Sequence, residues 1–415
     1  MIQKVQPRII NLLEKGICHP FLLNECFNFS TTPPKQGKDT SDLEKKAKSL
    51  SQQLFQAPKD FIIKLLTNNS NKVGIPSIEN LFYTASWSGR KELVKSLLEK
   101  YSPPINNKDQ HGYTALMLAS HNGHKEVVEL LLAIGAKVDC QAQNGYTALM
   151  LAIQNDHKEV AKLLLEKSAE LPLEKSADFI NVRGTKGVTA LILAADKGHE
   201  EVVQLLLEKG AEVDVQTEDF VREDVVRTAL MIASQNGHKE VVQLLLKKGA
   251  KVDCQAQDGY TALMIASQNG HKEVVQLLLK KGAKVDCQAQ DGCIALIVAS
   301  HNGHKEVVEL LLARGAKVDC QAQNGYTALM LAAKKGHKEV VELLLEKSAE
   351  VDVQTEDVVR TALMIASQNG HKKVVELLLK KSAEVDAKED TDKPSPTTRN
   401  PSSVKCLKKE VKMRQ

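Results

Sequence analysis

The tripeptide Thr-Ala-Leu recurs along the chain at a nearly constant interval. It begins at Thr114, Thr147, Thr189, Thr228, Thr261, Thr327 and Thr361, and Ile294-Ala295-Leu296 fills the remaining place. The successive spacings are 33, 42, 39, 33, 33, 33 and 34 residues. A degenerate copy begins at Asn80, so nine units span roughly 80–386. A period of this length indicates a row of small modules that stack on one another, not one large globule.

The copies are closely alike. Residues 228–259 are identical to residues 261–292. The two long spacings contain short duplications, since 166–169 recurs as 174–177 and 218–222 recurs with one change within 223–227. We expect these extra residues to leave the packed unit as loops, because otherwise the register of the following units would be lost.

One clean copy, 258–287, shows what each unit can fold into. Thr261 is a good N-cap for a short apolar helix over 262–267. Gly270 suits the left-handed position that ends a helix. A second helix over 271–280 is apolar on more than one face, so a single unit cannot bury it. Neighbouring units must therefore cover it.

This pattern resembles the ankyrin repeat over about three quarters of the chain. The residues that carry the resemblance are Gly259-x-Thr261-Ala262-Leu263, Ala266, Gly270-His271-x-Glu273-Val274-Val275, Leu278-Leu279 and Gly282-Ala283. The resemblance implies an all-α repeat solenoid of stacked helix-turn-helix units with β-hairpin fingers. It also implies a scaffold that binds proteins through the fingers and the concave, inner-helix face.

The sequence departs from the family pattern at three places. Thr-Ala-Leu-Met usually replaces Thr-Pro-Leu-His, so we expect Met231 and Met264 to pack where the family has a histidine. Asp156 stands where the turn between the helices has glycine, and it tolerates the left-handed conformation less well. Val-Val-Arg precedes Thr228 and Thr361 in place of the finger glycine, so these finger tips are expected to differ.

The ends do not follow the repeat. We divide the chain into an N-terminal segment and linker over 1–40, a helical N-terminal cap region over 41–79, the repeats over 80–386, and a disordered basic tail over 387–415. A helical pair at 41–67 would cover the apolar end of the stack. The alternative is that this pair is a separate segment that binds a partner.

Charge and hydropathy exclude several classes of protein. The net charge is +4, and residues 387–415 alone contribute +4 from eight basic and four acidic residues, so the rest is balanced. A nucleic-acid partner is therefore not expected for the repeats. No apolar run approaches the length of a membrane span, and Met1–Leu23 is a poor signal peptide. We expect reduced cysteines and a cytoplasmic protein, with the nucleus as a further location.

Two sets of residues, here called ladders, recur at equivalent positions in successive repeats and could suggest a metal site or disulfides. Equivalent histidines stand at His124, His157, His199, His238, His271, His304, His337 and His371. Packed helices lie about 8–10 Å apart, too far for these side chains to share a zinc ion, so we expect hydrogen bonds to the backbone. The same spacing separates Cys140, Cys254, Cys287 and Cys320 too widely for disulfides. We expect these cysteines to be small, semi-buried side chains, and Cys293, at a finger position of exposed type, is the one candidate for a more reactive thiol.

Catalytic motifs, phosphate loops and metal-binding patterns do not stand out, so we expect a non-enzymatic protein without cofactor or metal. The family resemblance places partner contacts on the fingers and on the ends of the inner helices. Tyr and Arg are enriched at interface hot spots and are the first candidates. The candidates are Tyr113, His121, Gln143, Asn144, Tyr146, Arg227, Gln257, Asp258, Tyr260, His301, Gln323, Asn324, Tyr326 and Arg360, with Gln154, Asp196, Gln235, Gln268, Lys334 and Gln368 at further inner-helix ends.

We therefore expect a monomeric interaction scaffold or adaptor whose partner is an unidentified protein and which takes no small-molecule substrate. Two alternatives remain open at the level of sequence. One is a nuclear or transcription-factor regulator that uses the repeats together with the basic tail. The other is the targeting part of a larger enzyme or signalling assembly.

Overall fold

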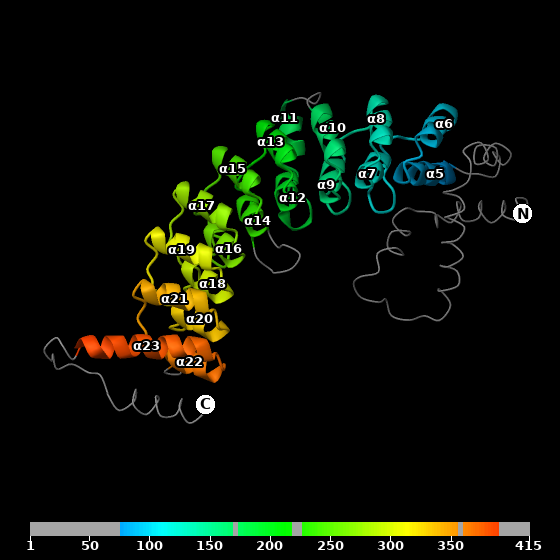
Figure 1. Ribbon diagram of the computed structural model, residues 1–415. Coiled ribbons are helices and arrows are strands. Elements are labelled where there is room, and N and C mark those ends of the chain that lie inside the picture. Colours follow the sequence, from blue (N-terminus) through cyan, green and yellow to red (C-terminus); the bar gives the residue numbers. More distant parts are fainter. Residues whose placement is uncertain (1–74, 169–172, 218–225, 356–359, 390–415) are drawn as a thin grey trace, which may run out of the picture. The chain divides into compact units, whose positions relative to one another are not determined.

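The computed structural model describes residues 75–168, 173–217, 226–355 and 360–389. These residues form α-helices joined by turns and loops, and no regular strand occurs among them. The chain divides into two compact units, one up to Val215 and one from Gln216 onward. Figure 1 shows the helices following one another in chain order, in pairs.

In the first unit, each repeat contributes a first and a second helix. The helices are α5 (Ile75–Trp87), α6 (Lys91–Tyr101), α7 (Ala115–His121), α8 (Lys125–Ala133), α9 (Ala148–Gln154), α10 (Lys158–Ser168), α11 (Leu173–Ile180), α12 (Ala190–Lys197) and α13 (Glu200–Glu208), with a 3-10 turn at Thr185–Gly187. The first helices pack in the order α5, α7, α9 and α12, and the second helices in the order α6, α8, α10 and α13. The predicted stack of repeats is thus confirmed for this unit.

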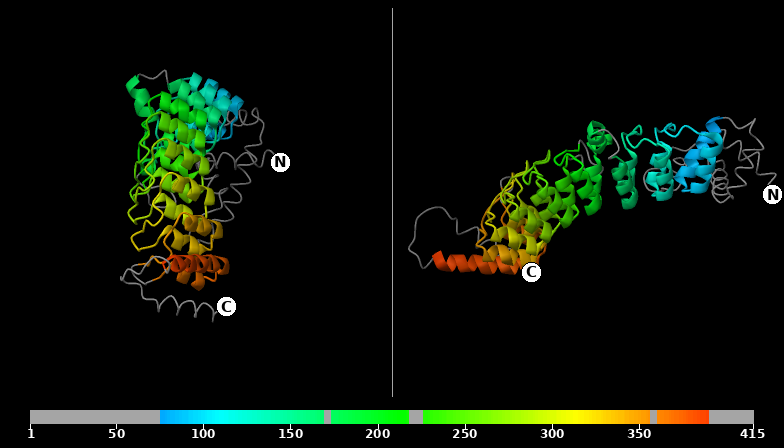
Figure 2. Two further views of the ribbon diagram at one scale, coloured as in Figure 1. Left: turned by 60° about the vertical axis from the view of Figure 1, so that its left-hand side comes forward. Right: turned by 90° about the horizontal axis from the view of Figure 1, so that it is seen from above.

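The second unit repeats the same arrangement with greater regularity. Its helices are α14 (Ala229–Gln235), α15 (Lys239–Lys247), α16 (Ala262–Gln268), α17 (Lys272–Lys280), α18 (Ala295–Asn302), α19 (Lys305–Ala313), α20 (Ala328–Lys335), α21 (Lys338–Glu346), α22 (Ala362–Gln368) and α23 (Lys372–Glu389). The even-numbered helices pack on one another, and so do the odd-numbered ones. Both views of Figure 2 show these pairs of helices as successive layers within the unit.

The recurring threonine begins the first helix of the repeat, as predicted. The Oγ1 atom of Thr261 accepts a hydrogen bond from the backbone N–H of Met264 at 3.4 Å. Met264 and Met231 are each only 1% exposed, which confirms that methionine packs at the start of this helix. Ile294 replaces the threonine in one repeat and makes no cap hydrogen bond, but it is fully buried. Apolar packing replaces the cap at that position.

The fingers are tight turns closed by two backbone hydrogen bonds. The N–H of Ala256 donates to the carbonyl of Tyr260 at 2.9 Å, and the N–H of Gly259 donates to the carbonyl of Ala256 at 2.9 Å. Gly259 has φ +81, and a Cβ atom there would lie 2.7 Å from the backbone nitrogen of Gln290. The fingers therefore resemble hairpin turns, but within the described residues they are too short to form the regular strands of a β-hairpin.

The prediction that the extra residues at the first long spacing leave as a loop is wrong. Part of this insertion forms the helix α11, and its residues Phe179 and Ile180 are 3% and 1% exposed. The duplicated segment leads into apolar side chains, and a helix lets them reach the core while its polar groups are satisfied internally. The prediction for the second long spacing concerns residues 218–225, which lie outside the described residues.

The predicted boundaries can be compared with the structure only in part. The helix α5 starts at Ile75, five residues before the predicted first unit, and α23 continues to Glu389, past the predicted boundary at 386. The segments 1–40 and 390–415, and nearly all of the predicted cap region 41–79, lie outside the described residues.

The two unusual finger tips are described only at their bases, where Thr217 N–H donates to the carbonyl of Arg227 at 3.0 Å. The corresponding bond before Thr361 joins Thr355 to Arg360 at 3.2 Å.

Candidate interaction site

The ladder histidines hold the turns of neighbouring repeats together. The Nε2 atom of His271 lies 2.8 Å from the carbonyl oxygen of Gln235, and that of His304 lies 3.0 Å from the carbonyl oxygen of Gln268. Equivalent contacts occur at His124, His157, His337 and His371. The prediction of histidines bonded to the backbone is confirmed at these positions. The residues Gln235 and Gln268 are thereby fixed through their own main chain.

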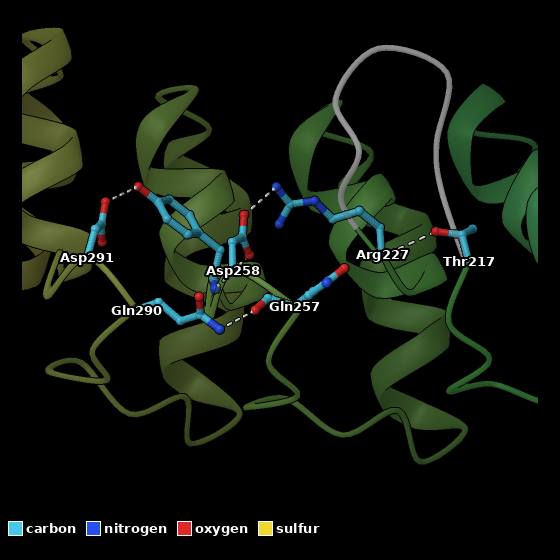
Figure 3. A network of polar contacts seen from close by, with 7 residues as sticks. Thr217, Arg227, Gln257, Asp258, Gln290 and Asp291 are labelled. Carbon is cyan, nitrogen blue, oxygen red and sulfur yellow. Dashed lines mark hydrogen bonds and ion pairs between the residues drawn. The ribbon is translucent and has the colours of Figure 1, made fainter.

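A chain of side-chain contacts crosses three consecutive fingers of the second unit (Figure 3). The guanidinium of Arg227 lies 3.3 Å from a carboxylate oxygen of Asp258. The other carboxylate oxygen of Asp258 accepts from the backbone N–H of Tyr260 at 3.0 Å. The hydroxyl of Tyr260 donates to Asp291 at 3.5 Å. A guanidinium, a carboxylate, a phenol and a second carboxylate thus follow one another along the fingers and restrain one another's orientation.

A second line of contacts is formed by glutamines of the same fingers. The side-chain amide of Gln290 donates to the carbonyl of Gln257 at 2.6 Å, and the amide of Gln323 donates to the carbonyl of Gln290 (Figure 3 shows the first of these). Backbone hydrogen bonds run in parallel, from Gln290 N–H to Asp258 at 3.0 Å and from Gln323 N–H to Asp291 at 2.9 Å. The fingers therefore form one connected polar surface.

The first unit carries a similar arrangement. The side chain of Gln143 donates to the carbonyl of Gln110 at 2.9 Å. The amide of Asn144 donates to the hydroxyl of Tyr113 at 3.3 Å, and its oxygen accepts from the N–H of Tyr146 at 3.1 Å. Tyr113 is only 6% exposed, so its side chain is largely buried. A contact between Tyr113 and a partner stays a prediction.

The remaining tyrosines differ in exposure and electrostatics. Tyr146, Tyr260 and Tyr326 are half-buried. Burial raises the pKa of Tyr146 and of Tyr260 above the ordinary range, and in Tyr260 nearby Cys293 and Asp291 add to the rise. Both phenols are therefore neutral hydrogen-bonding groups. The ammonium group of Lys334 lies 5.5 Å from the centre of the Tyr326 ring, within the range of a cation–π contact.

The other candidates differ in how far they are exposed. Gln143, Gln257, Gln323 and Asn324 are exposed, and so are the first-helix residues Gln154, Gln235, Gln268, Lys334 and Gln368. His121, Asp196, His301, Asn144, Arg227, Asp258 and Arg360 are half-exposed. Burial lowers the pKa of both His121 and His301. Both imidazoles are therefore neutral at physiological pH. Most of the predicted residues are thus at least partly open to solvent, and their role in binding a partner stays a prediction.

Cys293 does not have the reactive environment that its position suggested. It is half-buried, and burial together with the neighbouring Asp291 raises the pKa of its thiol to about 12. The thiolate is the nucleophilic form, so this environment makes the side chain less reactive. The ladder cysteines Cys140, Cys254, Cys287 and Cys320 are half-buried free thiols.

One set of stabilising residues was not found from the sequence. In each of five loops a side-chain oxygen accepts a hydrogen bond from the backbone 31 residues further along the chain. The pairs are Asn106–Lys137, Asn181–Glu212, Asp253–Lys284, Asp286–Lys317 and Asp319–Glu350, at 2.8 to 3.1 Å. The recurrence of Asn or Asp one period apart was a visible signal, but it looked the same as an ordinary solvated loop residue.

Two other classes of site can be assessed for the described part of the chain. Within it, no three His, Cys, Asp or Glu side chains come together in a group that could hold a metal ion. Its helices also include none with the length and apolar character needed to cross a bilayer.

The paired helices, glycine turns and polar fingers define a helical repeat protein whose fingers are linked from one repeat to the next. A family model described as "Ankyrin repeats (3 copies)" matches residues 81–175, 134–219, 217–291 and 296–389. The chain therefore belongs to the ankyrin repeat family, as its sequence predicted.

Similar curated proteins match only over short stretches. BTB/POZ domain-containing protein 3 of Schizosaccharomyces pombe is 54% identical over 48 residues, which is 12% of this chain and 9% of that protein. Ankyrin repeat domain-containing protein 39 of Homo sapiens is 43% identical over 63 residues, 15% of this chain and 34% of that protein. BCL-6 corepressor-like protein 1 of Mus musculus is 38% identical over 64 residues, 15% of this chain and 4% of that protein. The chain thus spans well under two thirds of the length of these relatives.

Proposed function

We propose that this protein is a non-enzymatic scaffold or adaptor that binds a protein partner through the surface formed by its fingers and first helices. Ankyrin repeats are in general protein–protein interaction modules, and the chain belongs to that family. The observation that supports the proposal best is the chain of contacts from Arg227 through Asp258 and Tyr260 to Asp291. A surface whose side chains are already ordered loses less free energy when a partner binds.

The chemistry of this surface suits a polypeptide. Amides such as Gln257 and Gln323 offer both donors and acceptors, and Tyr326 offers an aromatic ring with a cation above it. Interfaces of this type combine aromatic contacts with many hydrogen bonds. We propose a monomer in the cytoplasm, with the nucleus as a further location, which acts on no small molecule.

Comparative affinity capture from native lysate would test this function. Partners would be quantified by mass spectrometry for the wild type, for a finger variant with Tyr326→Ala and Asn324→Lys, and for a control with Lys239→Ala and Lys272→Ala. The control residues are exposed at the starts of the second helices. A partner that depends on the fingers should lose about tenfold in recovery with the finger variant, since a hot-spot tyrosine contributes on the order of 1–2 kcal/mol. Equal recovery with all three proteins would exclude this surface.

A second candidate function is a nuclear or transcription-factor regulator. One relative is named a corepressor-like protein, which favours this alternative. Binding of the full chain to DNA with a steep dependence on salt would support it. An unchanged location and unchanged partners after removal of the segment 390–415 would count against it.

A third candidate is that the repeats form the targeting part of a larger enzyme or signalling assembly. The matched stretches are small fractions of their relatives, 9% and 4% in two of them, so similar repeats occur within longer proteins. A longer transcript that encodes a catalytic domain in the same reading frame would favour this alternative over a self-contained adaptor.

A further inference from the structure

Basic side chains recur at one end of the second helices in the second unit, at residues that take no part in the finger contacts described above. The helix α15 ends at Lys247 and is followed by Lys248, and α17 ends at Lys280 and is followed by Lys281. Arg314 follows the end of α19. Together with one further lysine in the loop that follows each of these helices, these residues form what we call the basic ridge. Its exposed members are Lys247, Lys248, Lys251, Lys280, Lys281, Lys284, Arg314 and Lys317.

The stacking of the repeats places these groups at a regular interval. The helix α15 packs on α17, and α17 packs on α19 (Figure 1 shows their succession). Packed helices lie about 8–10 Å apart, so one cluster of cations follows another at that distance. Arg314 also donates to the carbonyl of Leu279 at 3.4 Å, which joins the third cluster to the end of α17.

The surface between the lysines is open. Each helix end is followed by a glycine, Gly249, Gly282 or Gly315, with φ of +93, +90 and +85. A Cβ atom at any of these glycines would meet no other atom within 4 Å. A bound chain can therefore approach the backbone closely within each cluster.

The helix dipole does not account for the number of cations. A positive charge near the end of a helix stabilises it by a few tenths to about 1 kcal/mol. The equivalent helix α8 nevertheless ends at Ala133 and is followed by Ile134. The helices α13 and α21 end at Glu208 and Glu346, and each glutamate is followed by a single lysine, Lys209 or Lys347. The fold thus accepts neutral and acidic residues at this position. The excess of basic charge belongs to the repeats between Lys247 and Lys317 and not to the architecture.

Acidic groups near the ridge set its charge pattern. Asp253 and Asp286 follow ridge lysines by two residues, and each accepts a hydrogen bond from the backbone N–H of the next repeat, at 2.9 and 3.1 Å. Glu240 and Glu273 lie on the first turn of α15 and α17, seven residues before the ridge and so about 10 Å along the helix. This exceeds the Debye length of about 8 Å at physiological salt. On α19, Glu309 lies five residues before Arg314, about 7.5 Å along the helix, so it lowers the net charge of the third cluster. The positive charge is therefore clustered once per repeat, with an aspartate between clusters.

We propose that the basic ridge binds an acidic peptide segment in the polyproline II conformation that carries an acidic residue at every third position. This conformation has three residues per turn and a rise of about 3.1 Å per residue, so equivalent side chains recur every ~9 Å. That repeat matches the spacing of about 8–10 Å between packed helices. Each carboxylate then meets one cluster of cations.

Charge complementarity distinguishes this partner from a nucleic acid. A nucleic-acid strand carries a phosphate about every 3.4 Å in a duplex, and would place some phosphates opposite Asp253 and Asp286. Single strands also gain from stacking on aromatic rings, and the eight ridge residues include none. The ridge shares no residue with the finger contacts described above, so variants of the ridge test this proposal without changing the residues on which the proposed function rests.

The test uses the full chain and a fluorescent peptide of four Glu-Pro-Pro repeats. Its control is a peptide of the same composition in which four glutamates precede eight prolines. Fluorescence anisotropy at about 50 mM and 150 mM salt should show weaker binding at the higher salt, because the interaction is between opposite charges. The periodic peptide should bind at least about fivefold more tightly than the control peptide, because only its spacing matches the ridge.

Paired charge reversals locate the binding. The variant Lys248→Glu with Lys281→Glu should lose at least about tenfold in affinity for the periodic peptide. The matched variant Lys239→Glu with Lys272→Glu makes the same change at the other end of α15 and α17, and should stay within about twofold. Circular dichroism would show that both variants are folded. Equal binding of the two peptides, or equal losses in the two variants, would overturn the proposal. Ridge-dependent binding of single-stranded RNA or of phosphatidylserine vesicles without binding of the periodic peptide would overturn it too.

Discussion

The Nε2 atom of His199 lies 2.5 Å from the carboxylate of Asp156, whereas equivalent histidines contact a main-chain carbonyl. The cause lies in the turn between the two helices of the repeat. Where this turn has glycine, as at Gly270, an added Cβ atom would lie 2.5 Å from the imidazole of His304. Asp156 has such a Cβ atom at φ +68, so the ring cannot take the usual place. The aspartate displaces the imidazole from the carbonyl and supplies another acceptor.

A pair of glycine substitutions would test this account. Gly270→Ala puts a Cβ atom against the imidazole of His304 as well as in a left-handed conformation, so it should reduce the free energy of unfolding by about 2–3 kcal/mol. Gly282→Ala is the control, because φ is +90 there but the space is open, and it should cost about 1 kcal/mol. Urea denaturation followed by circular dichroism measures both. Equal losses would show that the contact with the histidine is unimportant.

Substitutions of Asp156 distinguish the effect of its carboxylate as a hydrogen-bond acceptor from the strain of its left-handed backbone conformation. Asp156→Ala keeps the Cβ atom but removes the carboxylate, so we expect the free energy of unfolding to fall. The loss should be only about 1 kcal/mol, because the side chain of Asp156 is 67% exposed and solvent screens the contact. Asp156→Gly removes the strain as well and should be closer to wild type. An alanine variant as stable as the wild type would show that the carboxylate has no stabilising role, and an alanine variant more stable than the glycine variant would show that the strain is unimportant.

Stability should fall as the pH decreases below about 6.5. Burial lowers the pKa of His121, His124 and His199, and in His199 it outweighs the opposite effect of Asp156. Between the lowered pKa and the ordinary value of about 6.5, the unfolded chain binds more protons than the folded one, so folding weakens as protons are added. Above that range these imidazoles are neutral in both the folded and the unfolded chain, so they no longer reduce the stability.

The measurement is the urea midpoint at pH 7.5, 6.5 and 5.5, repeated with about 0.5 M NaCl. General repulsion among surface charges would be screened by the salt, but an effect of burial would persist. His121→Gln should weaken the dependence on pH, because this imidazole owes its lowered pKa mainly to burial. A midpoint that stayed constant or increased on acidification would contradict the prediction.

Cys293 should react slowly with thiol reagents. Its pKa rises from the ordinary 9.0 to about 12 because the thiol is buried near Asp291, so the thiolate fraction at pH 8 is about a thousandfold lower than for an ordinary thiol. Labelling with a chromogenic disulfide and identification of the modified peptide by mass spectrometry gives the rate at this position. Asp291→Asn removes the negative charge and should accelerate labelling. If Cys293 were labelled as fast as free cysteine, its thiol would not have the raised pKa that this environment predicts.

The sequence predicted the repeat architecture well, because the features involved are local or periodic. Thr261 caps its helix whatever its neighbours are, and the spacing of His271 and His304 already excluded a shared metal site. Exposure on the fingers could not be predicted in this way. Tyr113 and Tyr326 have the same position in the repeat, yet one is buried beside Asn144 and the other is half-exposed below Lys334. Tyr113 contacts Asn144 of the next repeat, and Tyr326 contacts Lys334 on the helix that follows it, so neither environment can be read from the position of the tyrosine alone.

Hydrogen exchange should reveal a less stable stretch around the first insertion. We expect the amides of α10 and α11 to exchange faster than those of α17, because the period of the repeat is interrupted between α10 and α12. The turn before α10 holds Asp156 in a left-handed conformation, and the Nδ1 atom of His199 is buried without a hydrogen-bond partner. Stacked repeats open at their weakest contacts, so these defects should lower the local free energy of opening. Mass spectrometry of deuterated peptides from α10 and α17 compares the two directly, and equal protection would show that the helix α11 compensates for the interruption.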